Sequence, residues 1–331
     1  MGNTISTCII IKNEIENIPY LVDDLRQFSD EIIIVDTGSV DGTYEWLQKQ
    51  DDIILKQFKW INDFAAARNE SFKYATKDWI FWCDADDRIS KDLIKDIKKL
   101  KKSLSKSKFD AYVINYKFTE YLDVPRNRLI RRNDTVKWTG KCHEYVMGSP
   151  WVTDNEYFYK NKNSNIIHKR DVLLNPHRHS DRNLKIFMWQ MLDINANVST
   201  RDLYYYINEL RDNGFLDKAV SLGEKQLFNP EMQAFDVYST IVHTLMKKYI
   251  QDYDTITHGT AVIQNFVNNT TIPIRGDIYG ALAALYYSLN HKDTAKEYAK
   301  LALETKEFDV INNFAFEPYY GKEMPKFILE N

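Results

Sequence analysis

Short apolar runs alternate with amphipathic segments through the first third of the chain. The β-branched runs at residues 7–12 and 31–36 predict strands, and the amphipathic residues 14–28 between them predict a helix. The alternation continues with two helices and two strands, predicted over residues 44–49, 53–57, 63–75 and 78–83. Strands that alternate with helices are typical of a mainly parallel sheet flanked by helices, which is an α/β fold.

Acidic residues follow two of these predicted strands directly. Asp36 ends the run 31–36, and Asp84 follows the run 78–83. Ligands of parallel sheets collect beyond the carboxyl ends of the strands, so both side chains are candidates for a binding site. Acids at strand ends also commonly cap helices or stabilise loops, and Asp36 alone does not separate these interpretations.

The stretch Phe81-Trp82-Cys83-Asp84-Ala85-Asp86-Asp87 runs from an apolar strand into three carboxylates within four residues. Clustered carboxylates repel one another and resist burial. Such a cluster is usually compensated by a divalent cation or by the hydroxyls of a ligand. It therefore predicts a metal or hydroxyl-binding site at this edge of the sheet.

The middle of the chain is less regular. Residues 90–107 predict a lysine-rich helix, for which a solvated face is expected, with a contact to a polyanion as the alternative. Residues 111–118 and 165–168 predict strands, and residues 126–132 hold four arginines around Leu129 and Ile130.

From about residue 181 the pattern changes to helices only. Helical spacing of apolar residues is evident over residues 203–210, 216–227, 235–249 and 260–268. Ala283, Tyr286, Ala295 and Ala302 have the small-aromatic-small offsets of a tetratricopeptide (TPR) helix pair. We therefore expect two domains, 1–180 and 181–331, the second a TPR-like array; an irregular helical bundle is the alternative.

Composition narrows the class of protein. The 331 residues are 44% hydrophobic, which suffices for packed cores, and the formal net charge of −3 gives no global reason to bind nucleic acid. Three scattered cysteines, Cys8, Cys83 and Cys142, do not predict a disulfide framework, which favours the cytoplasm. No apolar run reaches the length of a bilayer-spanning helix, so we expect a soluble protein.

Four blocks of sequence together resemble the family 2 glycosyltransferases of the GT-A fold, in particular a bacterial subgroup with a TPR-like helical tail. The blocks are residues 8–14, residues 31–43, residues 60–69 with the run Asp63-Phe64-Ala65-Ala66-Ala67-Arg68-Asn69, and residues 78–87. A fifth block, residues 136–144, resembles the segment that closes the catalytic domain. The resemblance implies a GT-A nucleotide-diphospho-sugar transferase domain followed by the all-α domain.

The resemblance also implies roles for the acids. It places Asp36 against the nucleobase, Asp84 near the ribose and Asp86 on a Mn²⁺ or Mg²⁺ ion that bridges the diphosphate of a nucleotide-sugar, with UDP as the expected nucleotide. Such a cation neutralises the charge that develops on the leaving nucleoside diphosphate. The role of Asp87 stays open, because an ion pair with Arg88 is an alternative.

The remaining candidates come from the same comparison. Arg68 is expected to contact the base or phosphate of the donor, or else to pair with a nearby surface acid. Glu144 is the candidate general base, since inversion by single displacement needs a carboxylate near the attacking group, with a purely structural carboxylate as the alternative. His168 is a candidate metal or phosphate ligand, and Trp138 could stack on the base or sugar.

The expected activity is metal-dependent, inverting sugar transfer to a peptide or protein held by the helical domain. A cell-surface glycan, a lipid-linked molecule or a nucleobase is the alternative acceptor, and the helical domain could instead form a homodimer. From another class of protein, a TPR interaction scaffold with a degenerate transferase domain is the rival interpretation.

Overall fold

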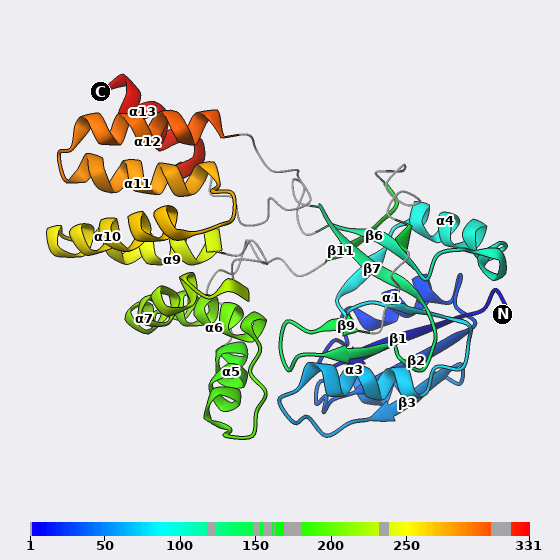
Figure 1. The fold of residues 1–331 in the computed structure, drawn as a ribbon. Coiled ribbons are helices and arrows are strands. Elements are labelled where there is room, and N and C mark those ends of the chain that lie inside the picture. Colours follow the sequence, from blue (N-terminus) through cyan, green and yellow to red (C-terminus); the bar gives the residue numbers. More distant parts are fainter. Residues whose placement is uncertain are drawn as a thin grey trace. The chain divides into compact units, whose positions relative to one another are not determined.

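The structure is a computed structural model, and it describes residues 2–117, 123–147, 153–154, 161, 163–168, 181–231, 238–305 and 319–331. The chain divides into two compact units, Met1–Arg178 and His179–Asn331. The N-terminal unit is built around a sheet, and the described secondary-structure elements of the C-terminal unit are all helices (Figure 1).

Four parallel strands form one half of the sheet. They are β1 (Ile5–Ile11), β2 (Glu31–Asp36), β3 (Ile53–Gln57) and β4 (Trp79–Trp82), in the order β3-β2-β1-β4. Helices α1 (Ile18–Leu25), α2 (Thr43–Leu47) and α3 (Phe64–Lys73) connect them along the chain. The predicted βα alternation is confirmed here, and it brings the residues that follow β2 and β4 to the same edge.

The other half of the sheet mixes directions. Strand β7 (Asp123–Arg131) is antiparallel to both β4 and β6 (Ala111–Lys117), and β11 (Asn165–His168) is parallel to β6. The short β5 (Asp87–Ile89) is antiparallel to β11 and sets His168 opposite Asp87. The two-residue β10 (Thr153–Asp154) pairs with β6.

The two faces of the sheet are covered by different helices. Residues 32 and 34 of β2 belong to the large apolar core that includes residues of α1 and of α4 (Lys91–Lys101). Between them, Ile33 contributes to a smaller cluster with Cys8, Ile80 and Phe72 of α3. Successive side chains of β2 therefore pack on opposite faces of the sheet, as the geometry of a strand requires.

A small hairpin closes the unit. Strands β8 (Lys137–Thr139) and β9 (Tyr145–Met147) pair in an antiparallel manner. Asn69 of α3 holds β8 through its side chain, which accepts from Trp138 N at 2.8 Å and donates to Trp138 O at 2.9 Å. Helix α3 therefore fixes the position of the loop that carries Glu144.

In the C-terminal unit each helix packs against the next described helix of the chain. The helices are α5 (Arg182–Leu192), α6 (Thr200–Asp212), α7 (Leu216–Leu227), α9 (Tyr238–Tyr249), α10 (Tyr253–Asn269), α11 (Gly276–Ser288), α12 (Lys292–Glu304) and α13 (Met324–Glu330). Ala283, Ala295 and Ala302 are buried where α11 meets α12. This is the close contact that the TPR spacing predicts. Among the described helices, none combines the length and apolarity needed to cross a bilayer.

Candidate active site

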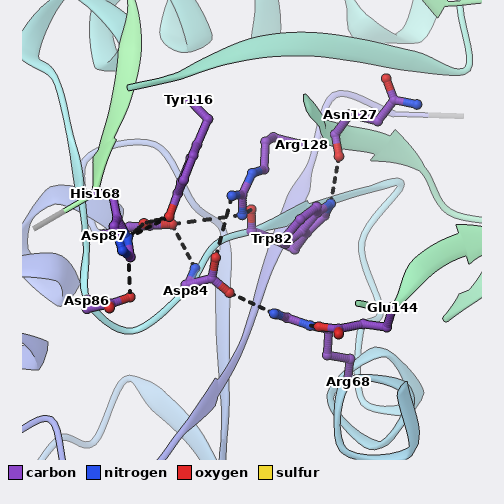
Figure 2. A network of polar contacts seen from close by, with 10 residues as sticks. All are labelled: Arg68, Trp82, Asp84, Asp86, Asp87, Tyr116, Asn127, Arg128, Glu144 and His168. Atoms are coloured by element: carbon purple, nitrogen blue, oxygen red, sulfur yellow. Dashed lines mark hydrogen bonds and ion pairs between the residues drawn. The ribbon is translucent and has the colours of Figure 1, made fainter. Parts of the chain in front are cut away.

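The acidic cluster lies where β4 turns into β5 (Figure 2). Asp84 and Asp86 occupy the turn, and Asp87 begins β5. The side chain of Asp87 is fully buried, that of Asp86 is 14% exposed and that of Asp84 is 30% exposed. The turn thus presents two accessible carboxylates above a third that belongs to the protein interior.

Arg68 joins this turn to the loop after β8. Its Nη2 donates to Asp84 Oδ1 at 2.7 Å and its Nε donates to Glu144 Oε1 at 2.6 Å. The guanidinium carbon lies 5.2 Å from the ring centroid of Trp82 and 4.8 Å from that of Trp138. Burial alone would lower the pKa of Arg68, but the charges of both acids outweigh this effect and raise it.

A second arginine, Arg128 of β7, lies on the other side of Asp84. Its Nη2 is 3.5 Å from Asp84 Oδ2 and its Nη1 is 3.8 Å from Asp87 Oδ2, while its guanidinium carbon lies 3.7 Å from the ring centroid of Trp82. Burial would raise the pKa of Asp84, yet the charges of Arg68 and Arg128 hold it well below its ordinary value. Asp84 is therefore ionised at any physiological pH.

Asp87 is fixed by hydrogen bonds to both of its oxygens. Oδ1 accepts from the Tyr116 hydroxyl at 2.7 Å and Oδ2 accepts from Asp84 N at 2.8 Å. The Tyr116 oxygen also lies 2.8 Å from His168 Nδ1. Because burial and the nearby carboxylates raise the pKa of Tyr116, its hydroxyl keeps the proton that it donates.

Asp86, Asp87 and His168 form a group with the composition of a metal site. One potential ligand atom from each lies within 4.8 Å of the others. His168 Nδ1 is 3.9 Å from Asp86 Oδ1. Burial and the charges of Asp84 and Asp87 outweigh the attraction of His168 and raise the pKa of Asp86 to about 6.

Asp36 lies at the end of β2 and is 2% exposed. Its Oδ1 accepts from the backbone N–H groups of Gly38 at 2.8 Å and Ser39 at 3.0 Å. Its Oδ2 is buried and has no hydrogen-bond partner among the residues that the structure describes. Because a buried carboxylate oxygen without a donor is costly, this atom fits a ligand that supplies an N–H or O–H group.

Glu144 and Trp138 come from the segment that the sequence singles out as the closing block. Gly140 has φ of +96° and His143 has φ of +51°, so the chain turns sharply between them and returns Glu144 to Arg68. The side chain of Glu144 is 11% exposed. Trp138 is 4% exposed, and its ring packs on Arg68 and, edge to face, on Trp82. Stacking of Trp138 on a donor thus stays a prediction.

The structure brings Arg68, Asp84, Asp86, Trp138, Glu144 and His168 into one connected group. Asp36 lies at the same edge of the sheet, as the last residue of β2, which pairs with β1. The ion pair considered for Asp87 is not present, because Arg88 pairs with Asp24 at 2.7 Å. Two further residues of the network, Arg128 and Tyr116, were not predicted from the sequence. They lie within strands and outside the blocks that resemble the family.

Comparison with known proteins agrees with the N-terminal architecture. Residues 6–165 match the family described as Glycosyl transferase family 2. The SPbeta prophage-derived glycosyltransferase SunS of Bacillus subtilis is 35% identical over 147 residues, which cover 44% of this chain and 35% of that protein. A TPR repeat-containing protein of Synechococcus elongatus is 30% identical over 145 residues, which cover 43% of this chain and 35% of that protein.

Among solved structures, Staphylococcus aureus TarS covers 92% of this chain and 56% of its own, with a TM-score of 0.41 and 12% identity. The chain spans about a third of the length of the curated relatives named above. The family match, together with the β3-β2-β1-β4 order and the acids after β4, confirms the expected GT-A fold for the N-terminal unit. Residues 6–165 form a glycosyltransferase domain of family 2.

Proposed function

We propose that this protein transfers a sugar from a UDP-linked donor to an acceptor hydroxyl or thiol, with inversion at the anomeric carbon and with the help of a divalent cation. One observation supports this most directly. Asp86 and His168, two potential metal ligands, lie beside Asp84, and Asp84 shares Arg68 with the candidate base Glu144. A cation, a donor and an attacking group can therefore meet at one place.

The residues present fit a cation. Both oxygens of Asp87 already accept hydrogen bonds from the protein, so Asp86 and His168 are the better candidates for direct ligands. The network contains four carboxylates, of Asp84, Asp86, Asp87 and Glu144, and three cationic or basic groups, the guanidinium groups of Arg68 and Arg128 and the imidazole of His168, so the carboxylates are in excess. An imidazole among the ligands favours Mn²⁺ over Mg²⁺, since Mg²⁺ prefers oxygen ligands alone. When bound, the cation would neutralise the charge on the diphosphate leaving group.

The free oxygen of Asp36 favours a uracil base. Uracil presents one ring N–H donor to a carboxylate, and Asp36 has one oxygen without a partner in the described part of the chain. Guanine presents two adjacent donors and is matched by a carboxylate with both oxygens available. Here Oδ1 already accepts from two backbone N–H groups, so UDP fits this position better than GDP.

The acceptor is activated by Glu144 in this proposal. Its carboxylate takes the proton of the attacking group, and the hydrogen bond from Arg68 Nε to Oε1 fixes its orientation. Arg68 is itself held between Asp84 and two tryptophan rings, so it cannot rotate freely. The base is thus positioned before the acceptor arrives.

For the acceptor we propose a peptide or protein, because stacked helix hairpins offer extended surfaces that suit chain-like ligands. A glycan, a lipid-linked molecule or a nucleobase is the alternative within the same activity. A homodimer through the helical unit is an alternative use of that surface. The rival proposal of a non-catalytic scaffold is disfavoured by the intact group of Asp84, Asp86, Glu144 and His168.

Thermal unfolding with nucleotides tests the donor site, because a ligand that binds only the folded state raises the melting temperature. We expect UDP with Mn²⁺ to raise it more than GDP with Mn²⁺, and Asp36→Ala to remove this preference. Asp86→Asn should reduce the effect of Mn²⁺ and lower the rate of sugar transfer at least about 100-fold. Full transfer by Asp86→Asn would contradict the metal-dependent mechanism. The anomeric proton of the product, observed by NMR, decides between inversion and retention.

A further inference from the structure

A run of lysines covers α4 and the turn that follows it. Residues 91–108 contain eight lysines, two aspartates and no arginine, although the whole chain carries a formal net charge of −3. Apart from Lys101, these lysines are exposed. This segment of 18 residues is therefore locally basic in a chain that is weakly acidic as a whole.

The lysines share one side of α4. The helix buries Leu93, Ile94, Ile97 and Leu100 against the core of the sheet. At about 100° per residue, Lys91, Lys95, Lys98, Lys99 and Lys102 fall within a sector of roughly 100° opposite these apolar residues. Lys106 is exposed on the next turn, the 3₁₀ helix Leu104–Lys106. We call these six residues the lysine face.

The lysine face contributes little to holding the fold together. Lys95 lies 3.4 Å from Asp92, an exposed i,i+3 pair that contributes at most about 1 kcal/mol. Lys98, Lys99, Lys102 and Lys106 have no acidic partner within the described ranges. Lys101, which is not part of the lysine face, forms a partly exposed ion pair at 2.6 Å from Asp30. Several like charges thus stand together without compensation from the protein.

We propose that the lysine face docks the N-terminal unit on a bilayer rich in anionic lipids. Its charges lie along one side of a helix of 11 residues, about 16 Å long, which suits a plane better than a groove. Lysine supplies mobile point charges, whereas defined phosphate pockets favour the forked arginine side chain. Residues 91–108 also contain no aromatic side chain, and stacking on aromatic rings is the usual basis of single-strand nucleic-acid binding.

The contact would be electrostatic and shallow. The apolar residues of α4 are buried in the core, so the helix has no apolar face to insert among acyl chains. Each lysine near an anionic surface contributes about 1 kcal/mol, which corresponds to about a fivefold gain in partition. The attraction falls off over a Debye length of about 8 Å at physiological salt, so binding must weaken steeply as salt is added.

Co-sedimentation with vesicles tests this proposal on the full chain. Vesicles of phosphatidylcholine with 30% phosphatidylglycerol should bind the protein at low salt, whereas pure phosphatidylcholine vesicles should not. The variant K98Q/K99Q/K102Q/K106Q should bind the anionic vesicles at least about 100-fold more weakly. All four side chains are exposed, so its melting temperature and its UDP binding should stay at wild-type values.

A matched control removes the same charge elsewhere. Lys49, Lys59, Lys247 and Lys300 are exposed and lie outside α4 and the turn after it, the first two in loops and the others in α9 and α12. Their replacement by glutamine should leave most vesicle binding intact. Equal losses in the two quadruple variants, or no binding of the wild type to anionic vesicles, would overturn the proposal. Tighter binding to single-stranded RNA than to anionic vesicles at the same salt would overturn the lipid assignment and identify a nucleic-acid surface.

Discussion

Among the single side chains of the site, Arg68 and Arg128 hold Asp84 in place. Arg68 and Arg128 contact opposite oxygens of Asp84, and both stack on Trp82. Removal of one partner from a buried ion pair costs about 3–5 kcal/mol, since the other charge is left uncompensated. The geometry of Asp84 is therefore set before a ligand binds, as preorganised sites require.

Glu144→Gln separates the proposed base from its structural surroundings. The amide oxygen can still accept from Arg68 Nε, so the loop and the donor site should keep their shape. A positioned general base contributes about 10²–10⁴ to the rate. We expect a loss of kcat in that range, with the affinity for UDP within a factor of about three of wild type.

Steady-state kinetics and calorimetric titration with UDP measure the two quantities. Asp41→Asn serves as the control. Asp41 lies in the turn after β2, where its Oδ1 accepts hydrogen bonds from the backbone N–H and the hydroxyl of Thr43. A kcat of Glu144→Gln within tenfold of wild type would exclude Glu144 as the base.

The raised pKa of Asp86 predicts a pH dependence of metal binding. Above pH 6 its carboxylate is mostly ionised, and below pH 6 a proton competes with the cation, because the pKa is about 6. Protonation of Asp86 alone should therefore raise the apparent Kd for Mn²⁺ by up to about tenfold for each pH unit below 6. Burial lowers the pKa of His168, but its hydrogen bond with Asp87 and the neighbouring carboxylates raise it, so loss of the imidazolium proton should extend a weaker dependence above pH 6. Titrations of Mn²⁺ followed by electron paramagnetic resonance give this profile.

Asp86→Asn is the control for the pH profile, since an amide does not titrate. Its residual Mn²⁺ binding should lose the break near pH 6. A break that persists in Asp86→Asn would assign the titration to another group, of which His168 is the nearest.

The sequence identified those site residues that stand in a recognisable local context. Asp36, Asp84 and Asp86 follow apolar strands directly, and Arg68 and Glu144 lie in recognisable blocks. Arg128 and Tyr116 gave no such signal, because each is one polar or amphipathic residue of a strand. They reach the site only through the pairing of β6, β7 and β11, and register between distant strands is not readable from a single sequence.

Elements with a strong apolar period were predicted nearly to the residue. Residues 31–36, 53–57 and 165–168 are strands β2, β3 and β11, as expected. Strand β7 was missed, since Pro125, Arg126, Asn127 and Arg128 break the apolar alternation. Strand β5 has three residues, and its pairing with β11 depends on the folded sheet. Propensity therefore located the parallel half together with β6 and β11, whereas β5 and β7 depend on their tertiary context.

In the helical unit, one buried acid links two elements. Asp277 of α11 accepts from the Ser239 hydroxyl of α9 at 2.7 Å, and it lies 3.3 Å from His243 Nε2. Burial would raise the pKa of Asp277, but the hydrogen bonds and the charges of His243 and Arg275 outweigh this effect and lower it. Its contribution to stability is thus present above its unfolded pKa near 3.8 and is lost as pH falls below that value.

Asp277→Ala should lower the free energy of unfolding of the helical unit by about 3–5 kcal/mol at pH 7, because it leaves buried donors without an acceptor. Asp217→Ala is the matched control: Asp217 also forms an ion pair, at 3.1 Å from Lys248, but its side chain is 85% exposed. The control should cost about 1 kcal/mol or less. Urea unfolding followed by circular dichroism measures both, and equal costs would show that α9 and α11 do not depend on this contact.

At the scale of the whole molecule, the two units have separate cores. The apolar cluster of the sheet unit contains residues of β1, β2, β4 and α4, whereas that of the other unit contains residues of α6, α7, α9 and α11. Every residue of the proposed donor site, from Asp36 to His168, belongs to the first unit. A ligand of that site should therefore stabilise the N-terminal unit and leave the stability of the helical unit unchanged.

Differential scanning calorimetry should accordingly resolve two transitions. Saturation with UDP and Mn²⁺ should raise only the transition of the N-terminal unit, by an amount set by RT ln(1 + [L]/Kd), which is about 2.7 kcal/mol at a hundredfold excess over Kd. Asp277→Ala should lower only the other transition, which identifies each of them independently. A single transition that moves as a whole under both changes would contradict this expectation, because it would mean that the two cores unfold cooperatively.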